Sequence, residues 1–157
     1  MENKEPKFNF KIFMVVLFVG LIVSKTVITP VIVDGNSMNP TLKNGQVLVG
    51  VRLDHSYHTG DIVVFHKKEE GTLIKRIVAV PGDTLSVENG VLMLNGKKSA
   101  YQFEKIKDAG ILKSPYTLSK DEYFCVGDNR NNSYDSRFFG VVDKKDIKIK
   151  LLDGNCN

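Results

Sequence analysis

The sequence predicts an all-β protein, a partly open antiparallel β-barrel or sandwich, preceded by one N-terminal transmembrane helix. Three observations lead to this prediction. An uncharged apolar run occupies residues 12–24, short runs rich in β-branched residues follow residue 30, and Gly, Pro, Asn and Asp separate those runs. Short β-type runs between strong turn signals are typical of antiparallel sheets. No helical periodicity is found after the apolar run.

The first apolar segment predicts an uncleaved membrane anchor. Residues 12–24 read IFMVVLFVGLIVS, and the apolar character resumes after Lys25 and Thr26. A membrane span needs about 20 residues, so we place the anchor at 12–29, with the long Lys25 side chain reaching an interface. A cleaved signal peptide would need small residues just after the apolar core, and the first alanine is Ala79.

The charges before the anchor predict its orientation. Lys4, Lys7 and Lys11 precede the span, so residues 1–11 are expected to form a cytoplasmic tail. Residues 30–157 would then form a β-rich domain on the outer face of the cell membrane, held there by a single span that contacts membrane lipid.

Predicted strands follow one another along this domain. The first, 46–53, places Val47, Val49, Val51 and Leu53 on one face. Asn-Gly pairs at 89–90 and 95–96 are hairpin turn signals on either side of another strand. Residues 97–120 are expected to be irregular. The full set of predicted strands is 46–53, 62–65, 72–80, 91–94, 122–126 and 147–152.

Composition excludes several classes of function. Hydrophobic residues make up 42% of the 157 residues and charged residues 25%, a globular balance. The net charge of +4 comes from dispersed lysines, which fits an anionic membrane surface and does not predict nucleic-acid binding. No metal or organic cofactor is expected, because the cysteines and histidines are scattered. Those residues are Cys125, Cys156, His55, His58 and His66.

The first chemical motif is the loop G-N-S-M-N-P-T-L at residues 35–42. A serine hydroxyl needs a base to become a nucleophile, and a loop with Gly and Pro beside the membrane would expose Ser37 to an incoming chain. The Ser37 backbone N–H is a candidate oxyanion donor. An ordinary polar turn is the alternative interpretation.

The second motif, T-L-I-K-R-I-V-A-V-P-G-D, covers residues 72–83. Strand periodicity places Leu73, Lys75, Ile77 and Ala79 on one face, with Arg76 pointing the other way. Burial among apolar neighbours would lower the pKa of Lys75, as a general base requires. A strand with an edge lysine that prevents aggregation is equally compatible with the segment.

The third motif is G-D-N-R-N-N-S-Y-D-S-R-F-F-G at residues 127–140. Its repeated Asp-x-Arg pattern indicates a cross-bridged framework that holds the backbone and Ser133 in place. A solvated charged loop is the alternative.

Taken together and in this order, the three motifs resemble those of bacterial type I signal peptidases, in particular the compact Gram-positive type with one membrane span. The resemblance covers the chain from the anchor to about Val142. It implies removal of signal peptides from exported preproteins after small residues of the Ala-x-Ala type, by a serine endopeptidase without cofactor.

The resemblance also implies residue roles. Ser37 would be the nucleophile, Lys75 the general base, and Ser133 the residue that orients the lysine. The framework would contain Asp128, Arg130, Asp135 and Arg137. Apolar pockets for small side chains would be formed by Met38, Leu42, Leu73 and Ile74. Some family members carry a serine two positions before the nucleophile that helps to bind the oxyanion. Here that position is Gly35, which leaves the second oxyanion donor open.

Other functions are considered beside this one. A self-cleaving Ser–Lys repressor would need an N-terminal DNA-binding helix-turn-helix, and the anchor stands in that place. A eukaryotic or archaeal-type signal peptidase would carry His at the position of Lys75. A catalytically inactive, membrane-anchored β module that binds exported chains is the alternative from another class. The oligomeric state, the preferred preproteins and the roles of Cys125 and Cys156 stay open, although Cys125 is expected to be buried.

Overall fold

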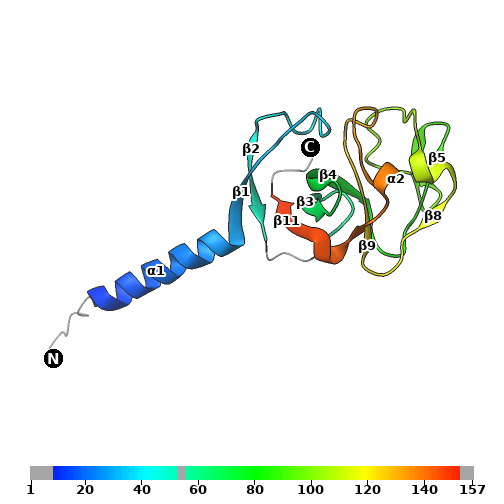
Figure 1. The fold of residues 1–157 in the computed structure, drawn as a ribbon. Helices are drawn as coiled ribbons and strands as arrows, with labels where there is room; N and C mark the ends of the chain where they lie inside the picture. Colours follow the sequence, from blue (N-terminus) through cyan, green and yellow to red (C-terminus); the bar gives the residue numbers. More distant parts are fainter. Residues whose placement is uncertain (1–8, 53–55, 153–157) are drawn as a thin grey trace, which may run out of the picture.

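A computed structural model describes residues 9–52 and 56–152 (Figure 1). Its strands form a seven-stranded sheet, in the order β1-β2-β11-β3-β4-β9-β10, and a four-stranded sheet, in the order β7-β6-β5-β8. Every paired strand in these sheets is antiparallel. The predicted mostly β, antiparallel fold is confirmed, and the sheets remain open and do not close into a barrel.

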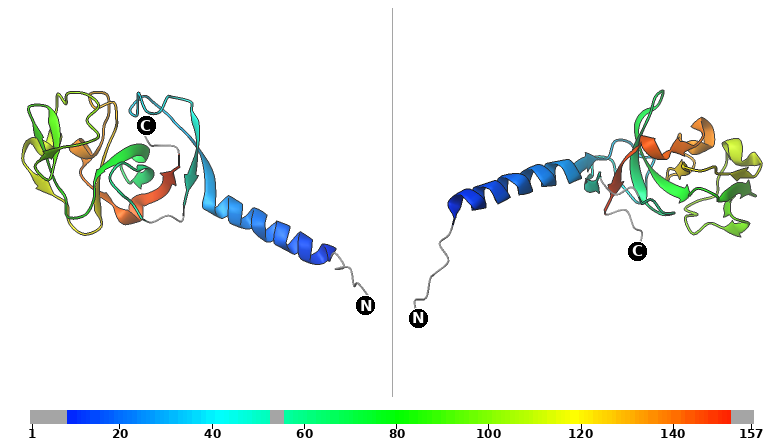
Figure 2. Two further views of the ribbon diagram at one scale, coloured as in Figure 1. Left: turned by 180° about the vertical axis from the view of Figure 1, so that it is seen from behind. Right: turned by 90° about the horizontal axis from the view of Figure 1, so that it is seen from below.

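Helix α1 (Phe10–Val27) extends away from the β-rich domain (Figures 1 and 2). Asn9 caps it, since the Asn9 side chain accepts a hydrogen bond of 3.2 Å from the Lys11 N–H. The helix ends before Pro30, which disfavours helical backbone at the preceding residue. It therefore stops two residues short of the predicted end at 29, and Ile28 begins strand β1. Within the described ranges, no helix combines the length and the apolar character required to cross a membrane.

The larger sheet carries most of the predicted strands. Its edge strand β1 contains Pro30, which an edge tolerates because the missing N–H is not needed for pairing there. The prediction of a strand at 122–126 is confirmed, and the other predicted strands of this sheet overlap the observed ones. The strands are β1 (Ile28–Ile32), β2 (Val47–Val51), β11 (Ile147–Leu151), β3 (Ile62–Lys67), β4 (Gly71–Ala79), β9 (Glu122–Val126) and β10 (Val142–Asp143).

The smaller sheet is built on a tight hairpin. Asn89 and Gly90 have φ angles of 51° and 81°, which a two-residue turn with positive φ requires, so the predicted turn is confirmed. Strand β5, which precedes this turn, was not among the predicted strands, although Leu85 and Val87 alternate with polar residues there. The strands are β5 (Thr84–Glu88), β6 (Val91–Leu94), β7 (Lys97–Lys98) and β8 (Tyr116–Thr117).

Short helical turns complete the domain. They are η1 (Gly110–Lys113), α2 (Ser136–Phe139) and η2 (Lys144–Asp146). The first lies within 97–120, the segment expected to be irregular, and α2 lies within the third motif. Asp135 caps α2, because its side chain accepts a hydrogen bond from the Arg137 N–H.

Three apolar clusters stabilise these layers. One joins the loop after β1 to the large sheet and includes Val33, Met38 and Val64. A second includes Phe65, Ile77 and Cys125. The third packs the end of β4 against the smaller sheet through residues such as Val78, Ala79, Leu85 and Phe124.

Strand β4 does not keep a constant face along its length. The pairing register with β9 shifts between Ile77 and Ala79. Because a shift of this kind breaks the alternation of side chains, Ala79 packs in the same cluster as Val78, while Ile77 packs in another. The expectation that Ala79 shares a face with Lys75 and Ile77 is therefore wrong.

Candidate active site

The loop that carries Ser37 follows directly after β1. The Gly45 N–H donates to the Val33 carbonyl at 2.8 Å, and the Gly35 N–H donates to the Asn44 side chain at 2.8 Å. Gly35 has φ +87°, in the left-handed region that glycine adopts without steric cost. Met38, only 1% exposed, inserts into the apolar cluster below. The loop is thus closed at its base and pinned beside Ser37.

Lys75 approaches this loop from β4. Its Nζ and Ser37 Oγ form a hydrogen bond of 2.8 Å, although the two residues are 38 positions apart in the sequence. Only 3% of Lys75 is exposed. Burial lowers the pKa of the Lys75 amine, while the charge of Asp135 acts in the opposite direction. The pair therefore combines a hydroxyl with a lysine that is easier to deprotonate than usual.

Buried ion pairs fix the framework loop. Asp128 pairs with Arg76 at 2.8 Å, and Asp135 pairs with Arg137 at 2.8 Å, in both cases almost without solvent contact. Asp135 also accepts a hydrogen bond from the Gly127 N–H at 3.1 Å. Two buried charges of opposite sign stay paired in a fixed geometry, because leaving either charge buried without its partner would strongly destabilise the fold. The solvated-loop interpretation is therefore excluded for these side chains.

Arg130 holds the loop by another route. Its guanidinium donates to the backbone carbonyls of Gly127 at 3.0 Å and of Tyr101. The group also lies 5.4 Å from the centroid of the Phe103 ring. Burial lowers the Arg130 pKa to about 10. Arg76, which sequence reasoning left without a role, is the residue that pairs with Asp128.

Ser133 lies close to the loop of Ser37. A Cβ placed on Gly127 would come within 2.2 Å of Ser133 Oγ and 2.5 Å of the Ser37 carbonyl oxygen. Only glycine fits between them. Ser133 Oγ is buried and has no hydrogen-bond partner among the described residues, so it is available to a nearby donor or acceptor.

A small cavity of about 170 Å³ opens beside Ser37 and Lys75. Its walls come from the end of β1 with the residues that follow, and from the first half of β4. Met38, Leu73 and Ile74 line it, and Leu42 does not. The remaining lining residues are Val31, Ile32, Val33, Asp34, Val64 and Thr72, whose contribution depends on the fold and has no local signal.

The cysteines and histidines of the sequence form no part of the Ser37–Lys75 hydrogen bond. Cys125 is fully buried, as expected, and burial raises the pKa of its thiol. His58 and His66 are exposed. His55 and Cys156 fall outside the described residues. No group of residues suited to holding a metal ion occurs in the part of the chain that the structure describes.

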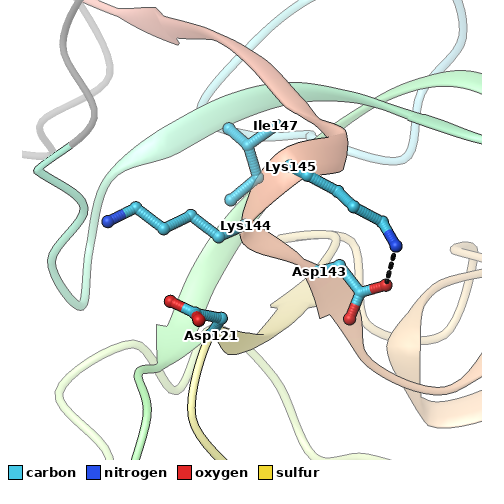
Figure 3. A pocket seen from close by; sticks show the side chains of 5 residues that line it. All are labelled: Asp121, Asp143, Lys144, Lys145 and Ile147. Atoms are coloured by element: carbon cyan, nitrogen blue, oxygen red, sulfur yellow. Dashed lines mark ion pairs between the residues drawn. The ribbon is translucent and has the colours of Figure 1, made fainter.

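A wider cleft lies at the junction of β10, η2 and β11 (Figure 3). Asp121, Asp143, Lys144, Lys145 and Ile147 line it, and Asp143 and Lys145 form an ion pair of 3.4 Å. None of these residues belongs to the three motifs. The wider cleft therefore contains none of the predicted catalytic residues.

A serine hydroxyl that is hydrogen-bonded to a buried lysine, on an open β scaffold, defines a candidate serine hydrolase site with lysine as the candidate base. Comparison with known proteins then gives the family. Residues 7–151 match the family described as "Signal peptidase, peptidase S26", and the chain belongs to that family. Membership implies a protease.

Two named relatives and one solved structure are similar to this chain. A protein named Signal peptidase I P from Bacillus subtilis subsp. natto is 38% identical over 164 residues, which cover 93% of this chain and 89% of that protein. Signal peptidase IB of Staphylococcus aureus strain Mu50 is 32% identical over 172 residues, with coverage of 94% and 88%. A crystal structure of a signal peptidase I from Enterococcus faecalis V583 aligns with a TM-score of 0.47 at 26% identity, covering 59% of this chain and 93% of that one.

Proposed function

We propose that this chain removes signal peptides from preproteins, with Ser37 as nucleophile and Lys75 as general base. The observation that carries the proposal is the 2.8 Å hydrogen bond between Lys75 Nζ and Ser37 Oγ inside a family of signal peptidases. The names of the relatives supply the substrate class, and the geometry supplies the chemistry.

The reaction follows from the two side chains. Neutral Lys75 takes the Ser37 proton as Oγ attacks the carbonyl carbon of the residue before the cleavage site. The tetrahedral intermediate collapses to an acyl-enzyme, and the ammonium of Lys75 returns the proton to the leaving amine of the mature protein. Lys75 then takes a proton from water as the water oxygen attacks the ester carbonyl, and returns that proton to Ser37 Oγ as the ester bond breaks and the signal peptide is released.

Ser133 is proposed to orient Lys75. The support is its buried, unpartnered hydroxyl beside Gly127 and the Ser37 carbonyl. A lysine side chain carries several rotatable bonds, so a second hydrogen-bond partner would restrict the amine to the position it needs for proton transfer.

The cavity beside Ser37 suits an extended peptide with small side chains. Strand β1 ends the larger sheet, and β4 pairs with β9 only from Arg76 onward, so 71–75 have a strand on one side only within the described residues. A peptide between these edges could add as a strand, through backbone hydrogen bonds. The cavity of about 170 Å³ is lined by apolar side chains such as those of Met38 and Leu73 and by the polar side chain of Thr72, and we assign to it the binding of the small residues before the cleavage site.

Membrane anchoring through residues 12–29 is part of the proposal. Apolar side chains along α1 are exposed, including Phe10, Val16 and Phe18 at 64%, 65% and 65%, which water disfavours. The span requires Lys25 to reach an interface. Extraction of membranes with alkaline carbonate provides the test: the chain is expected to stay with the lipid, and its release into the soluble fraction would contradict the anchor.

The pH dependence of cleavage is expected to reflect Lys75. Only the neutral amine can accept the Ser37 proton, so kcat/KM should rise with pH through the pKa of Lys75 and then level off. Because burial lowers this pKa, the rise should lie below the ordinary lysine value of about 10.4. Initial rates on a fluorogenic signal-peptide substrate across pH measure it. A rate that falls over this range would contradict the assignment of the base.

Covalent labelling of Ser37 tests the proposal most directly. Wild-type protein in detergent is expected to cleave a preprotein with an Ala-x-Ala site and to react with a serine-directed acylating probe at Ser37, as seen by mass spectrometry of peptides. Ser37→Ala should lose both activities. Cleavage that survives in Ser37→Ala would disprove the assignment, and an unlabelled wild type that does not cleave would favour the inactive binding module.

A further inference from the structure

We infer that Asn129 is a positioning residue that aims the Ser37 backbone N–H, the candidate oxyanion donor, toward the substrate. The inference rests on the proposed function, because an oxyanion forms only if Ser37 attacks a carbonyl. It assigns a role in the reaction to a residue of the framework loop that has no acid, base or nucleophile to offer.

Asn129 holds two successive peptide groups of the Ser37 loop. Its side-chain Nδ2 donates to the Asn36 carbonyl oxygen at 3.1 Å. Its backbone N–H donates to the Ser37 carbonyl oxygen at 3.0 Å. The peptide carbonyl groups on both sides of Ser37 therefore accept hydrogen bonds from one residue, Asn129, which lies 93 positions after Asn36.

The hydrogen bond from Asn129 to the Asn36 carbonyl also fixes the direction of the Ser37 N–H, because both groups belong to the same planar peptide. A trans peptide is planar, so the Asn36 C=O and the Ser37 N–H point in opposite directions. Because Asn129 holds the oxygen, the Ser37 N–H must point away from the framework loop. Within the described part of the chain no hydrogen bond occupies this N–H. The donor is therefore oriented and free.

The Ser37 loop needs such a restraint from outside. Within the loop, the Asn36 carbonyl oxygen accepts only a longer hydrogen bond, from the Asn39 N–H at 3.2 Å. The peptide between the two central residues of this turn, Ser37 and Met38, can flip between standard turn types, and the hydrogen bond from the Asn129 backbone N–H to the Ser37 carbonyl opposes that flip. The preceding peptide, which carries the Ser37 N–H, follows the conformationally free Gly35 by one residue, and the Asn129 side chain holds its carbonyl oxygen. Gly35 also has no hydroxyl to offer an oxyanion. The backbone donor, and hence its orientation, carries more of the stabilisation.

Asn129 is itself held rigidly. It lies between Asp128 and Arg130, each only 1% exposed, and Asp128 is fixed by its ion pair with Arg76. The Asn132 N–H closes a turn onto the Asn129 carbonyl at 3.0 Å. Rigidity of the framework is thereby transmitted to the Ser37 peptide groups through two hydrogen bonds.

Asn129→Ala removes the side-chain bond and leaves the backbone bond in place. We expect kcat for a signal-peptide substrate to fall about 10- to 100-fold, less than the ~10²–10³ typical of deleting an oxyanion donor itself, with KM changed less than about twofold. Asn132→Ala is the matched control, since it is an exposed asparagine of the same loop. Its kcat should equal that of wild type.

A second readout separates positioning from general damage. A peptide boronate forms a tetrahedral adduct with Ser37 that places an oxygen at the oxyanion position, whereas the cleaved signal peptide does not. The boronate should lose affinity in Asn129→Ala by about the same factor as kcat, while the affinity for the product peptide stays constant. Asn129→Asp, which has the same size and no side-chain N–H, should show the same pattern if the alanine variant folds poorly.

Several results would overturn the inference. They are an unchanged kcat in Asn129→Ala, an equal loss of boronate and product affinity, or an equal loss in Asn132→Ala. A wild type that neither cleaves nor reacts at Ser37 would overturn the proposed function and this inference with it. Wild-type cleavage together with an unaffected Asn129→Ala would overturn only the inference.

Discussion

Replacing Lys75 by methionine is expected to lower kcat for signal-peptide cleavage by about 10²–10⁴-fold, the range that loss of a general base produces. Methionine keeps the length and apolar character of the buried stem and removes the amine that lies 2.8 Å from Ser37 Oγ. Without that amine the hydroxyl has no base and remains a weak nucleophile. The rate of Ser37 labelling by an acylating probe should fall in parallel, because that reaction needs the same proton transfer.

Lys68→Met is the control for this prediction. Lys68 is exposed in the turn between β3 and β4, on the hairpin that also carries Lys75, so its replacement removes the same charge without touching the site. Its kcat should match that of wild type. Retention of wild-type kcat by Lys75→Met, with the variant shown to be folded by its thermal transition, would exclude Lys75 as the base.

Replacing Arg76 by alanine is expected to lower the free energy of unfolding by about 3–5 kcal/mol, as loss of one partner from a buried ion pair does. Arg76 and Asp128 are both fully buried, and the guanidinium also donates to the Gly60 carbonyl at 2.7 Å. The substitution leaves the Asp128 carboxylate buried without its countercharge and the Gly60 carbonyl without this donor. Denaturant unfolding of wild type and variant measures the difference.

An exposed ion pair in the same domain provides the comparison. Asp143 and Lys145 lie 3.4 Å apart at the wide cleft, with side chains 51% and 79% exposed (Figure 3). Water solvates both partners, so Lys145→Ala should leave the unfolding transition unchanged. Similar effects of Arg76→Ala and Lys145→Ala would show that burial does not determine the strength of these pairs.

The fold is predictable where the signals are local. The strands at 91–94 and 122–126 follow from short apolar and aromatic runs, and the Asn89-Gly90 turn follows from residues that accept positive φ. Strand β1 is not among the predicted strands, because its first residues continue the apolar character of the helix. Strand β5 is absent from the predicted strands although Leu85 and Val87 alternate with Thr84, Ser86 and Glu88, which is the period expected of a half-buried strand. Strand β1 depends on its pairing with β2, which follows after the Ser37 loop, whereas β5 pairs with β6 directly across the Asn89-Gly90 turn.

The candidate site shows the same division. Ser37 and Lys75 stand out because their motifs occur in a specific order, and the structure brings their side chains together. The partner of Asp128 could not be read from the Asp-x-Arg pattern, which points to an arginine nearby, whereas the fold supplies Arg76 from β4. Leu42 lies near Ser37 in the sequence and packs in the apolar cluster, but it does not line the cavity beside Ser37.

The sequence by itself determined the family and the mostly β fold class, and it predicts Ser37 and Lys75 as the reactive pair, because each of these depends on residue type and order along the chain. Tertiary structure alone decided the burial of Lys75, the pairing of Arg76 with Asp128 and the contact of Asn129 with the Ser37 loop. These features depend on distances between segments separated by tens of residues. Such distances are set by strand pairing and core packing, and neither can be predicted from the sequence of a single segment.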